Sequence, residues 1–98
     1  MSSPVEVFPE ARQDIFDGRA FFESRRPGLG EAFVNEVLDA LDQIATHPEM
    51  YGEVGPGVRA AGVRQFGYVV HYRVGPVGVE VIAVLHGGRD PAVWQGRA

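Results

Sequence analysis

The stretch that decides the fold is residues 58–86, VRAAGVRQFGYVVHYRVGPVGVEVIAVLH. Over residues 64–74, apolar and aromatic side chains occupy the even positions from Phe66 to Val74, and this alternation indicates a half-buried strand. The Gly-Pro pair at 75–76 predicts a turn. Residues 77–86 are apolar on both parities, which is typical of a central strand. With a further strand expected over residues 58–63, the stretch predicts an antiparallel meander.

A register for the last two strands follows from charge. If Val74 lies opposite Val79, Arg73 lies opposite Glu80 and the two form a favourable cross-strand pair. The same register pairs His71 with Ile82, Val69 with Val84 and Gly67 with His86, and brings Arg64 near Arg89. The sheet face away from any helices would then carry Val69, His71, Arg73, Glu80, Ile82, Val84 and His86.

That face is half apolar, and only residues 87–98 remain in the chain to cover it, with Trp94 as their one large side chain. An exposed strip of this kind is typical of a protein-binding surface. The alternative is that Trp94 and its neighbours fold back over the strip.

Two helices are expected upstream of the meander. Pro9 suits the first position of a helix over residues 9–25, which Pro27 and Gly28 terminate. Apolar residues recur with helical spacing from Phe33 to Ala45, and the helix ends before Pro48. Residues 5–8 form a short apolar run suited to a strand. The chain therefore predicts a single domain over residues 1–98 with the order β-α-α-β-β-β, an α+β fold in which a helical hairpin packs on one face of a small twisted antiparallel sheet.

Composition narrows the chemistry. The 98 residues include nine cationic side chains, all arginine, and thirteen carboxylates, which give a net charge of −4. Residues 51–98 carry five arginines and three carboxylates, so this half is mildly basic. The excess can mark a surface for an acidic partner or nucleic acid. Alternatively, the acidic residues simply lie on the solvated faces of the helices, which belong to the other half. Without cysteine there is no thiolate metal site or cysteine nucleophile. No apolar run is long enough to span a membrane and the start does not resemble a signal peptide, so we expect a cytoplasmic protein.

The search for catalytic motifs is mostly negative. His47, His71 and His86 lack the spacing of metal ligands, and no serine lies in a nucleophile elbow, so we expect no metal and no cofactor. The polar residues around the end of the last strand remain. His86 and Arg89, with Arg64 and Arg59 brought near by the sheet, could bind a phosphodiester and assist proton transfer. The alternative is structural, with Asp90 closing a turn.

The order and spacing of these pieces resemble the RelE/ParE superfamily of toxins from bacterial type II toxin–antitoxin modules. The resemblance runs from Val5 to Arg97, and its marks are Pro9-Glu10-Ala11, Pro27-Gly28-Leu29-Gly30 with Phe33, Ile44 to Pro48 with Tyr51, Val58-Arg59, the run from Phe66 to Tyr72, and the run from Val84 to Pro91 with Trp94.

The resemblance implies one of two activities. RelE-like members cut messenger RNA on the ribosome with several lysines and arginines; here a lysine-based site is excluded, and Arg64, His86 and Arg89 remain as a lysine-free alternative. ParE-like members are similar in the His-Gly-x-Arg-Asp-Pro ending and the long second helix, and they imply a non-enzymatic toxin that poisons DNA gyrase. A net charge of −4 suits RNA binding poorly. We therefore favour the ParE-like branch, while a degenerate, non-toxic member stays open.

The resemblance also implies a cognate antitoxin, a small DNA-binding protein whose flexible C-terminal segment wraps the toxin. No membrane and no sequence-specific nucleic acid is expected as a partner. The candidates for the toxic surface are Arg59, Arg64, His86, Arg89, Asp90 and Trp94. The candidates for antitoxin binding are Val69, His71, Arg73, Ile82 and Val84, of which Val69, Ile82 and Val84 are expected to lose exposure in the complex.

Overall fold

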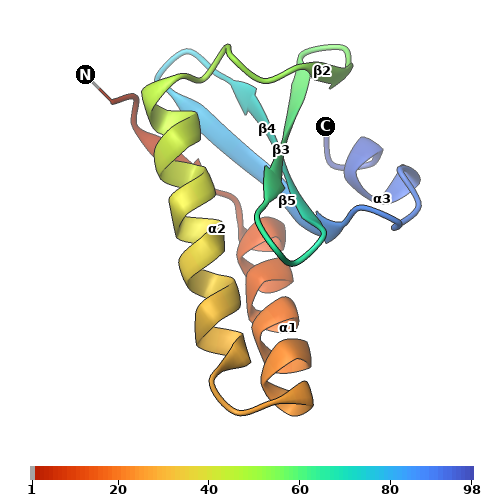
Figure 1. The fold of residues 1–98 in the computed structure, drawn as a ribbon. Coiled ribbons are helices and arrows are strands. Elements are labelled where there is room, and N and C mark those ends of the chain that lie inside the picture. The colour runs from red at the N-terminus through yellow and green to blue at the C-terminus, as the bar shows by residue number, and fades with distance from the viewer. Residues whose placement is uncertain (1) are drawn as a thin grey trace.

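The computed structural model describes residues 2–98 and places two long helices against one face of a five-stranded sheet (Figure 1). The elements are β1 (Val5–Val7), α1 (Pro9–Arg25), α2 (Leu29–Thr46), β2 (Glu53–Gly55), β3 (Val58–Val63), β4 (Tyr68–Val74), β5 (Val79–His86) and α3 (Ala92–Gln95). The α+β fold and the helical hairpin are confirmed. The short elements β2 and α3 were not predicted from the sequence.

The sheet has the order β1-β5-β4-β3-β2. Strands β2 to β5 are antiparallel neighbours, as predicted, but β1 pairs with β5 in parallel. The sheet is therefore mixed rather than purely antiparallel, because the helical hairpin returns the chain to the sheet before the meander begins.

The hairpin turn is stabilised by a carboxylate from the first helix. Gly28 has φ +88°, a left-handed conformation that glycine adopts without strain. The Glu23 carboxylate accepts hydrogen bonds from the backbone N–H groups of Gly28 and Gly30, at 3.1 Å for each shorter contact. An acidic group here satisfies N–H groups that the start of α2 would otherwise leave without a partner.

The main core lies between the hairpin and the sheet. Phe33, Val37 and Ile44 of α2 are fully buried there, and Phe22 of α1 packs on Phe33 with ring centroids 5.1 Å apart. Gly18 lets the helices meet closely, since a Cβ at this position would lie 2.7 Å from the Phe33 ring.

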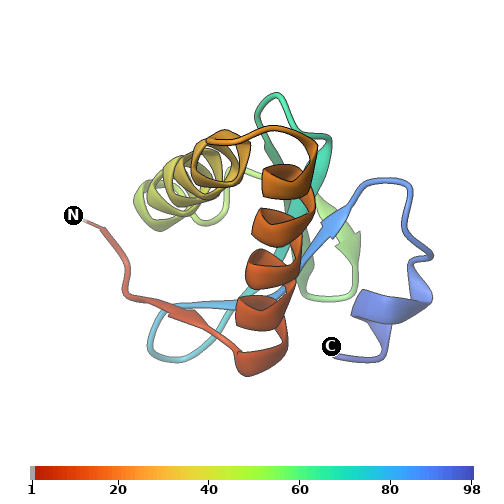
Figure 2. The ribbon, with the colours of Figure 1, turned by 90° about the horizontal axis from the view of Figure 1, so that it is seen from below.

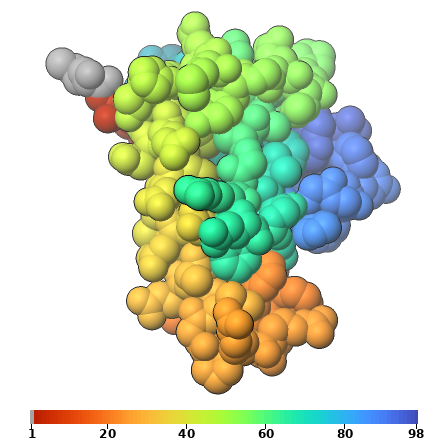
Figure 3. All heavy atoms as spheres, viewed as in Figure 1, coloured from red at the N-terminus to blue at the C-terminus, as the bar shows by residue number. Residues whose placement is uncertain are grey.

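A second apolar cluster lies on the opposite face of the sheet, under α3. It consists of Val58, Ile82, Ala83, Leu85 and Trp94. Figure 2 shows the segment with α3 standing beyond the sheet, away from the hairpin, and Figure 3 shows it lying against the strands. Because both faces of β5 are covered, its residues are apolar on both parities.

The predicted strand over 64–74 begins four residues later, at Tyr68. Residues 64–67 form a turn in which Gln65 and Gly67 have positive φ angles of 73° and 69°. Phe66 continues the alternating pattern because its ring reaches the core from the turn. Its ring centroid lies 4.8 Å from that of Phe22.

The predicted register holds for Val74 opposite Val79 and Arg73 opposite Glu80. Beyond Tyr72 it is wrong by one residue, because β5 bulges at Ile82. The observed partners are His71 with Ala83, Val70 with Val84, Val69 with Leu85 and Tyr68 with His86. Beyond the bulge, each side chain of β5 lies on the face opposite to the one predicted. The alternating pattern of β4 could not reveal this, because the extra residue lies in β5.

Candidate functional site

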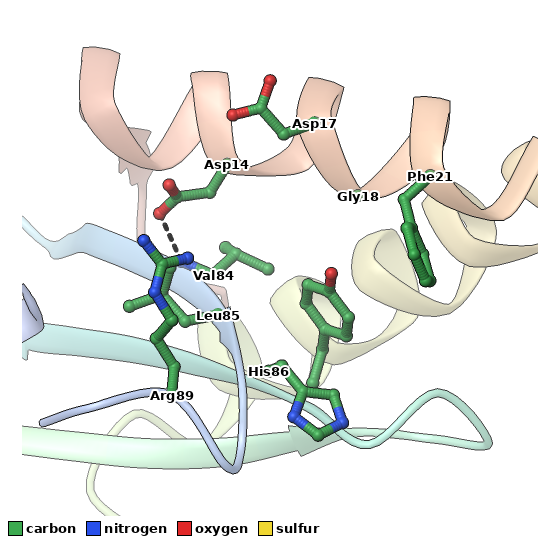
Figure 4. Close-up of a pocket in the computed structure, with 9 residues that line it drawn as sticks. Asp14, Asp17, Gly18, Phe21, Val84, Leu85, His86 and Arg89 are labelled. Carbon is green, nitrogen blue, oxygen red and sulfur yellow. Dashed lines mark hydrogen bonds between the residues drawn. The ribbon is translucent and has the colours of Figure 1, made fainter.

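A hollow of about 240 Å³ lies between α1 and the end of β5 (Figure 4). Asp14 and Asp17 of α1 form one wall, and His86 and Arg89 lie across from them. His86 and Arg89, which the sequence placed together, are thus confirmed as neighbours. The two carboxylates beside them were not expected.

Tyr68 reports the electrostatics of this hollow. Burial raises the pKa of its hydroxyl; Arg89 acts in the opposite direction, while Asp14 and Asp17 add to the increase. Charges of both signs therefore act across the hollow. The carboxylates offset the attraction that Arg89 exerts on a phosphate, so this hollow is less suited to a phosphate backbone than a purely cationic site would be.

His86 is exposed and positioned for hydrogen bonding. Its Nδ1 accepts the N–H of Gly88 at 3.1 Å, so in the neutral ring the proton sits on Nε2. The ring lies edge-on to Tyr68 with centroids 5.7 Å apart. Nε2 is thus the atom of His86 that can donate to a partner.

Arg64 does not join this group. It sits in the turn before β4 and lines a separate hollow with Glu36 and Asp39 of α2. The prediction that Arg64 approaches Arg89 is wrong, since the turn at 64–67 replaces the strand that would have carried Arg64 alongside β5.

Arg59 lies at the other end of the sheet, opposite Tyr72 in the β3–β4 ladder. Its Nη1 donates to the backbone carbonyls of Tyr51, at 2.6 Å, and Glu49, at 3.2 Å. Arg59 thus fastens the loop after α2. The arginines expected near one edge of the sheet are dispersed over three places.

Asp90 and Trp94 have structural partners. The Asp90 carboxylate accepts the N–H of Ala92 at 3.0 Å and closes a turn just before α3; a turn closed by Asp90 is what the structural alternative predicted. Trp94 is 8% exposed, and its ring stacks on His71 with centroids 5.0 Å apart and planes at 19°. Trp94 is therefore covered rather than presented at the surface.

The strip expected to bind an antitoxin is largely covered as well. Ile82 and Val84 are 1% and 0% exposed, so the expectation that they lose exposure in a complex is wrong. His71 and Ile82 lie under α3, as the fold-back alternative predicted, whereas the bulge turns Val84 into the helix-facing core. Val69 and Arg73 stay partly exposed, and Arg73 pairs with Glu80 at 2.7 Å as predicted.

Asp14 and Arg97 are the polar pair that the sequence analysis missed. Asp14 Oδ2 accepts from Arg97 Nη1 at 2.6 Å and from the N–H of Val84 at 3.0 Å. Arg97 Nη1 also donates to the carbonyl of Ile82 at 3.2 Å. The pair therefore satisfies the backbone groups at the bulge. The sequence feature that could have revealed the pair is the position of Asp14: it lies between Ala11 and Gly18 on the buried side of α1, where a carboxylate needs a partner.

No group of three or more potential metal ligands occurs among residues 2–98. Within the same residues, no helix is both long and apolar enough to cross a membrane.

Known proteins place this chain in a family. The family model for the ParE toxin of the type II toxin–antitoxin system parDE matches residues 5–91. The chain is 29% identical over 84 residues to Toxin RelE3 of Caulobacter vibrioides, a match that covers 84% of this chain and 91% of that protein. In a solved structure of the chromosomal ParDE system from P. aeruginosa, one chain has the same fold, with a TM-score of 0.78, 11% identity, and coverage of 87% of this chain and 96% of that one. The family model spans nearly the whole sequence, and the chain therefore belongs to the ParE toxin family of type II toxin–antitoxin modules.

Proposed function

We propose that this toxin acts by binding DNA gyrase and not by cutting RNA. The observation that carries the proposal is the setting of His86 and Arg89: they share a hollow with Asp14 and Asp17, while Arg64 lies elsewhere. Cleavage of a phosphodiester needs cationic groups around the phosphate and a residue that transfers a proton. Because Asp14 is paired with Arg97, Asp17 is the carboxylate that remains to face Arg89 and His86. This mixed set suits a protein partner with charges of both signs better than a phosphate.

On this proposal, Arg89 and His86 form the contact edge toward gyrase. Both side chains are exposed; His86 is the last residue of the buried strand β5, and Arg89 lies three residues beyond it. An exposed guanidinium on such a strand end is typical of a contact that contributes strongly to a protein interface.

A supercoiling assay with purified gyrase tests the proposal. We expect the wild-type protein and His86→Gln to inhibit comparably, because binding requires no proton transfer. Arg89→Ala should weaken inhibition by about tenfold or more, the loss of one interface anchor. The matched control is Arg26→Ala, an exposed arginine at the hairpin turn, which should inhibit like wild type. Full supercoiling at saturating toxin would refute the proposal.

The alternative is a ribosome-dependent messenger RNA endonuclease. The free Nε2 of His86 beside Arg89 favours it, as does the similarity to a protein named RelE3. Arg64, the third residue of that candidate set, lines a different hollow with Glu36 and Asp39, which speaks against this alternative. Primer extension on messages from a translating extract distinguishes the two: cleavage that disappears in His86→Gln and Arg89→Ala would establish the nuclease. Uncut messages would reject it.

Pairing with an antitoxin follows from the module, and we further propose that the antitoxin is a small DNA-binding protein with a segment that orders on the toxin. With most of the sheet strip covered, the groove on the outer side of the hairpin is the better site. It measures about 300 Å³ and is lined by Ile15, Phe16 and Val34, with Phe16 57% exposed.

Phe16→Ser should therefore weaken antitoxin binding at least tenfold in calorimetry while the toxin stays folded. Val77→Ser, at an 82% exposed apolar side chain on the β4–β5 turn, serves as the control. Equal affinity of both variants would exclude the groove. Induced expression in cells tests whether the toxin is active, since growth without arrest would indicate a degenerate member.

A further inference from the structure

Residues 87–98 form a segment that covers the sheet face opposite the helical hairpin; we call it the strap. Its contacts with the rest of the protein depend on few groups. After the N–H of Gly87, which donates to the carbonyl of Gly67 at 2.8 Å, the backbone hydrogen bonds among residues 88–98 stay within the strap and the adjoining His86. Two side chains fasten it further along: Trp94 against the sheet and Arg97 on Asp14.

The surface under the strap is apolar. Val58, Ile82, Ala83 and Leu85 are at most 4% exposed with the strap in place. Trp94 closes over them: its ring stacks on His71, and its far edge reaches Gly55, where a Cβ would lie 3.0 Å from it. Release of the strap would therefore expose a continuous hydrophobic face.

Among residues 2–98, His71 is the titratable side chain buried beneath this cover. It is 8% exposed, and its Nδ1 is buried without a hydrogen-bond partner among residues 2–98. An imidazole with an unsatisfied nitrogen in an apolar setting gains hydrogen bonds to water as soon as it is uncovered. Burial of His71 is thus already unfavourable when the ring is neutral.

The surroundings of His71 also resist a positive charge. Its neighbours across β3 and β5 are Ala60 and Ala83, which carry none. Arg97 approaches from the strap and Asp14 from α1. Burial lowers the pKa of His71 and Arg97 lowers it further, while Asp14 and the backbone of Val69 act in the opposite direction with smaller effects.

Two further basic groups lie on the same side. His86 and Arg89 line a small hollow of about 80 Å³ together with His71 and Trp94. Of the charged groups near His71, Asp14 is the acidic one, and it is already paired with Arg97. A proton on His71 therefore adds a positive charge beside Arg89 and against the effect of Arg97.

We propose that His71 is a pH-sensitive latch: protonation of its imidazole releases Trp94 and α3 from the sheet and uncovers the apolar face beneath the strap. The sign follows from linkage. With the strap docked, the pKa of His71 lies below its usual value of about 6.5, while in the released state it returns to that value. Docking is strongest above about pH 6.5 and weakens as the pH falls toward the docked-state pKa. For each pKa unit by which the docked state lies below the released state, full protonation weakens docking of the strap about tenfold.

Trp94 is the single tryptophan of the chain, so its emission reports on the strap directly. We expect a red shift of the emission maximum between pH 7.5 and 5.0, a range above the usual titration of carboxylates. Amide exchange of residues 92–97, corrected for intrinsic rates, should accelerate at least tenfold over the same range. Exchange in α2 should stay unchanged, which separates strap release from global unfolding.

His71→Phe keeps an aromatic ring against Trp94 and removes the titration, so its strap should stay protected at pH 5.0. The matched control is His47→Gln, an exposed histidine after α2 that should behave as wild type. Equal acid exposure in His71→Phe and wild type would overturn the proposal, as would an unchanged strap in wild type. If His71→Phe fails to fold, the imidazole resonances of the wild-type protein decide: a His71 pKa of 6.5 or more refutes the latch.

Discussion

Asp14 and Arg97 lie eighty-three residues apart in the chain and form an ion pair of 2.6 Å. The contact joins the first helix to the strap and crosses the strand whose bulge it stabilises, since Asp14 also binds the N–H of Val84. The Asp14 hydrogen bond raises the pKa of Arg97.

Asp14→Ala removes the acceptor for both Val84 and Arg97. The side chains of Asp14 and Arg97 are 10% and 22% exposed, so solvent partly screens the ion pair. We expect Asp14→Ala to lower the free energy of unfolding by about 3 kcal/mol. Asp14→Asn keeps an oxygen for Val84 and should lose less. Urea denaturation measures both. Asp39→Ala, at an exposed carboxylate of α2, is the control and should change stability by less than about 0.5 kcal/mol. A similar small change for Asp14→Ala would contradict the assigned role.

Gly18→Ala tests the close approach of the helices. Alanine favours a helix over glycine by about 1 kcal/mol, but its Cβ would lie 2.7 Å from the Phe33 ring, which sits in a full core. We expect a net destabilisation of about 1–2 kcal/mol from overpacking. Gly62→Ala in β3, where a Cβ meets nothing within 4 Å, should be neutral or stabilising. Thermal unfolding of the two variants gives the comparison, and a more stable Gly18→Ala would show that the interface has spare room.

Arg59 and Arg64 form a matched pair of arginines with different environments. Arg59 holds two carbonyls of the loop after α2, so Arg59→Ala should destabilise the protein by about 1–2 kcal/mol. Arg64 is exposed in a turn, and Arg64→Ala should fall within about 0.5 kcal/mol of wild type. Chemical denaturation measures both changes. Equal effects would mean that the loop contacts of Arg59 contribute nothing.

Alkaline stability depends on Tyr72. Its hydroxyl donates to the carbonyl of Pro48 at 2.6 Å, and burial raises its pKa above the usual value of about 10, against the effect of Arg59. A raised folded-state pKa means that this stabilisation is complete below pH 10 and is lost as the pH rises through the folded value. The unfolding free energy of wild type should therefore fall above pH 10, more steeply than that of Tyr72→Phe. Parallel curves for the two proteins would exclude Tyr72 as a source.

The helical hairpin and the meander could be predicted because their signals are local. The spacing of Phe33, Val37 and Ile44 fixes one buried helix face, and the Arg73–Glu80 pair fixes a register near a tight turn. The candidate site was predicted less well. His86 and Arg89 are neighbours in the chain and stay neighbours in space, whereas Arg64 needed an unbroken strand to reach them.

The sequence by itself determined the order of the longer elements, the buried helix faces and the absence of lysine and cysteine chemistry, because periodicity and composition need no knowledge of distant contacts. Only the tertiary structure decided three further features: the bulge at Ile82, the carboxylates beside His86, and the strap over His71. Each depends on groups that different elements bring together. The bulge exists where Asp14 and Arg97 satisfy its backbone, and no local pattern in β5 encodes partners that lie in α1 and beyond α3.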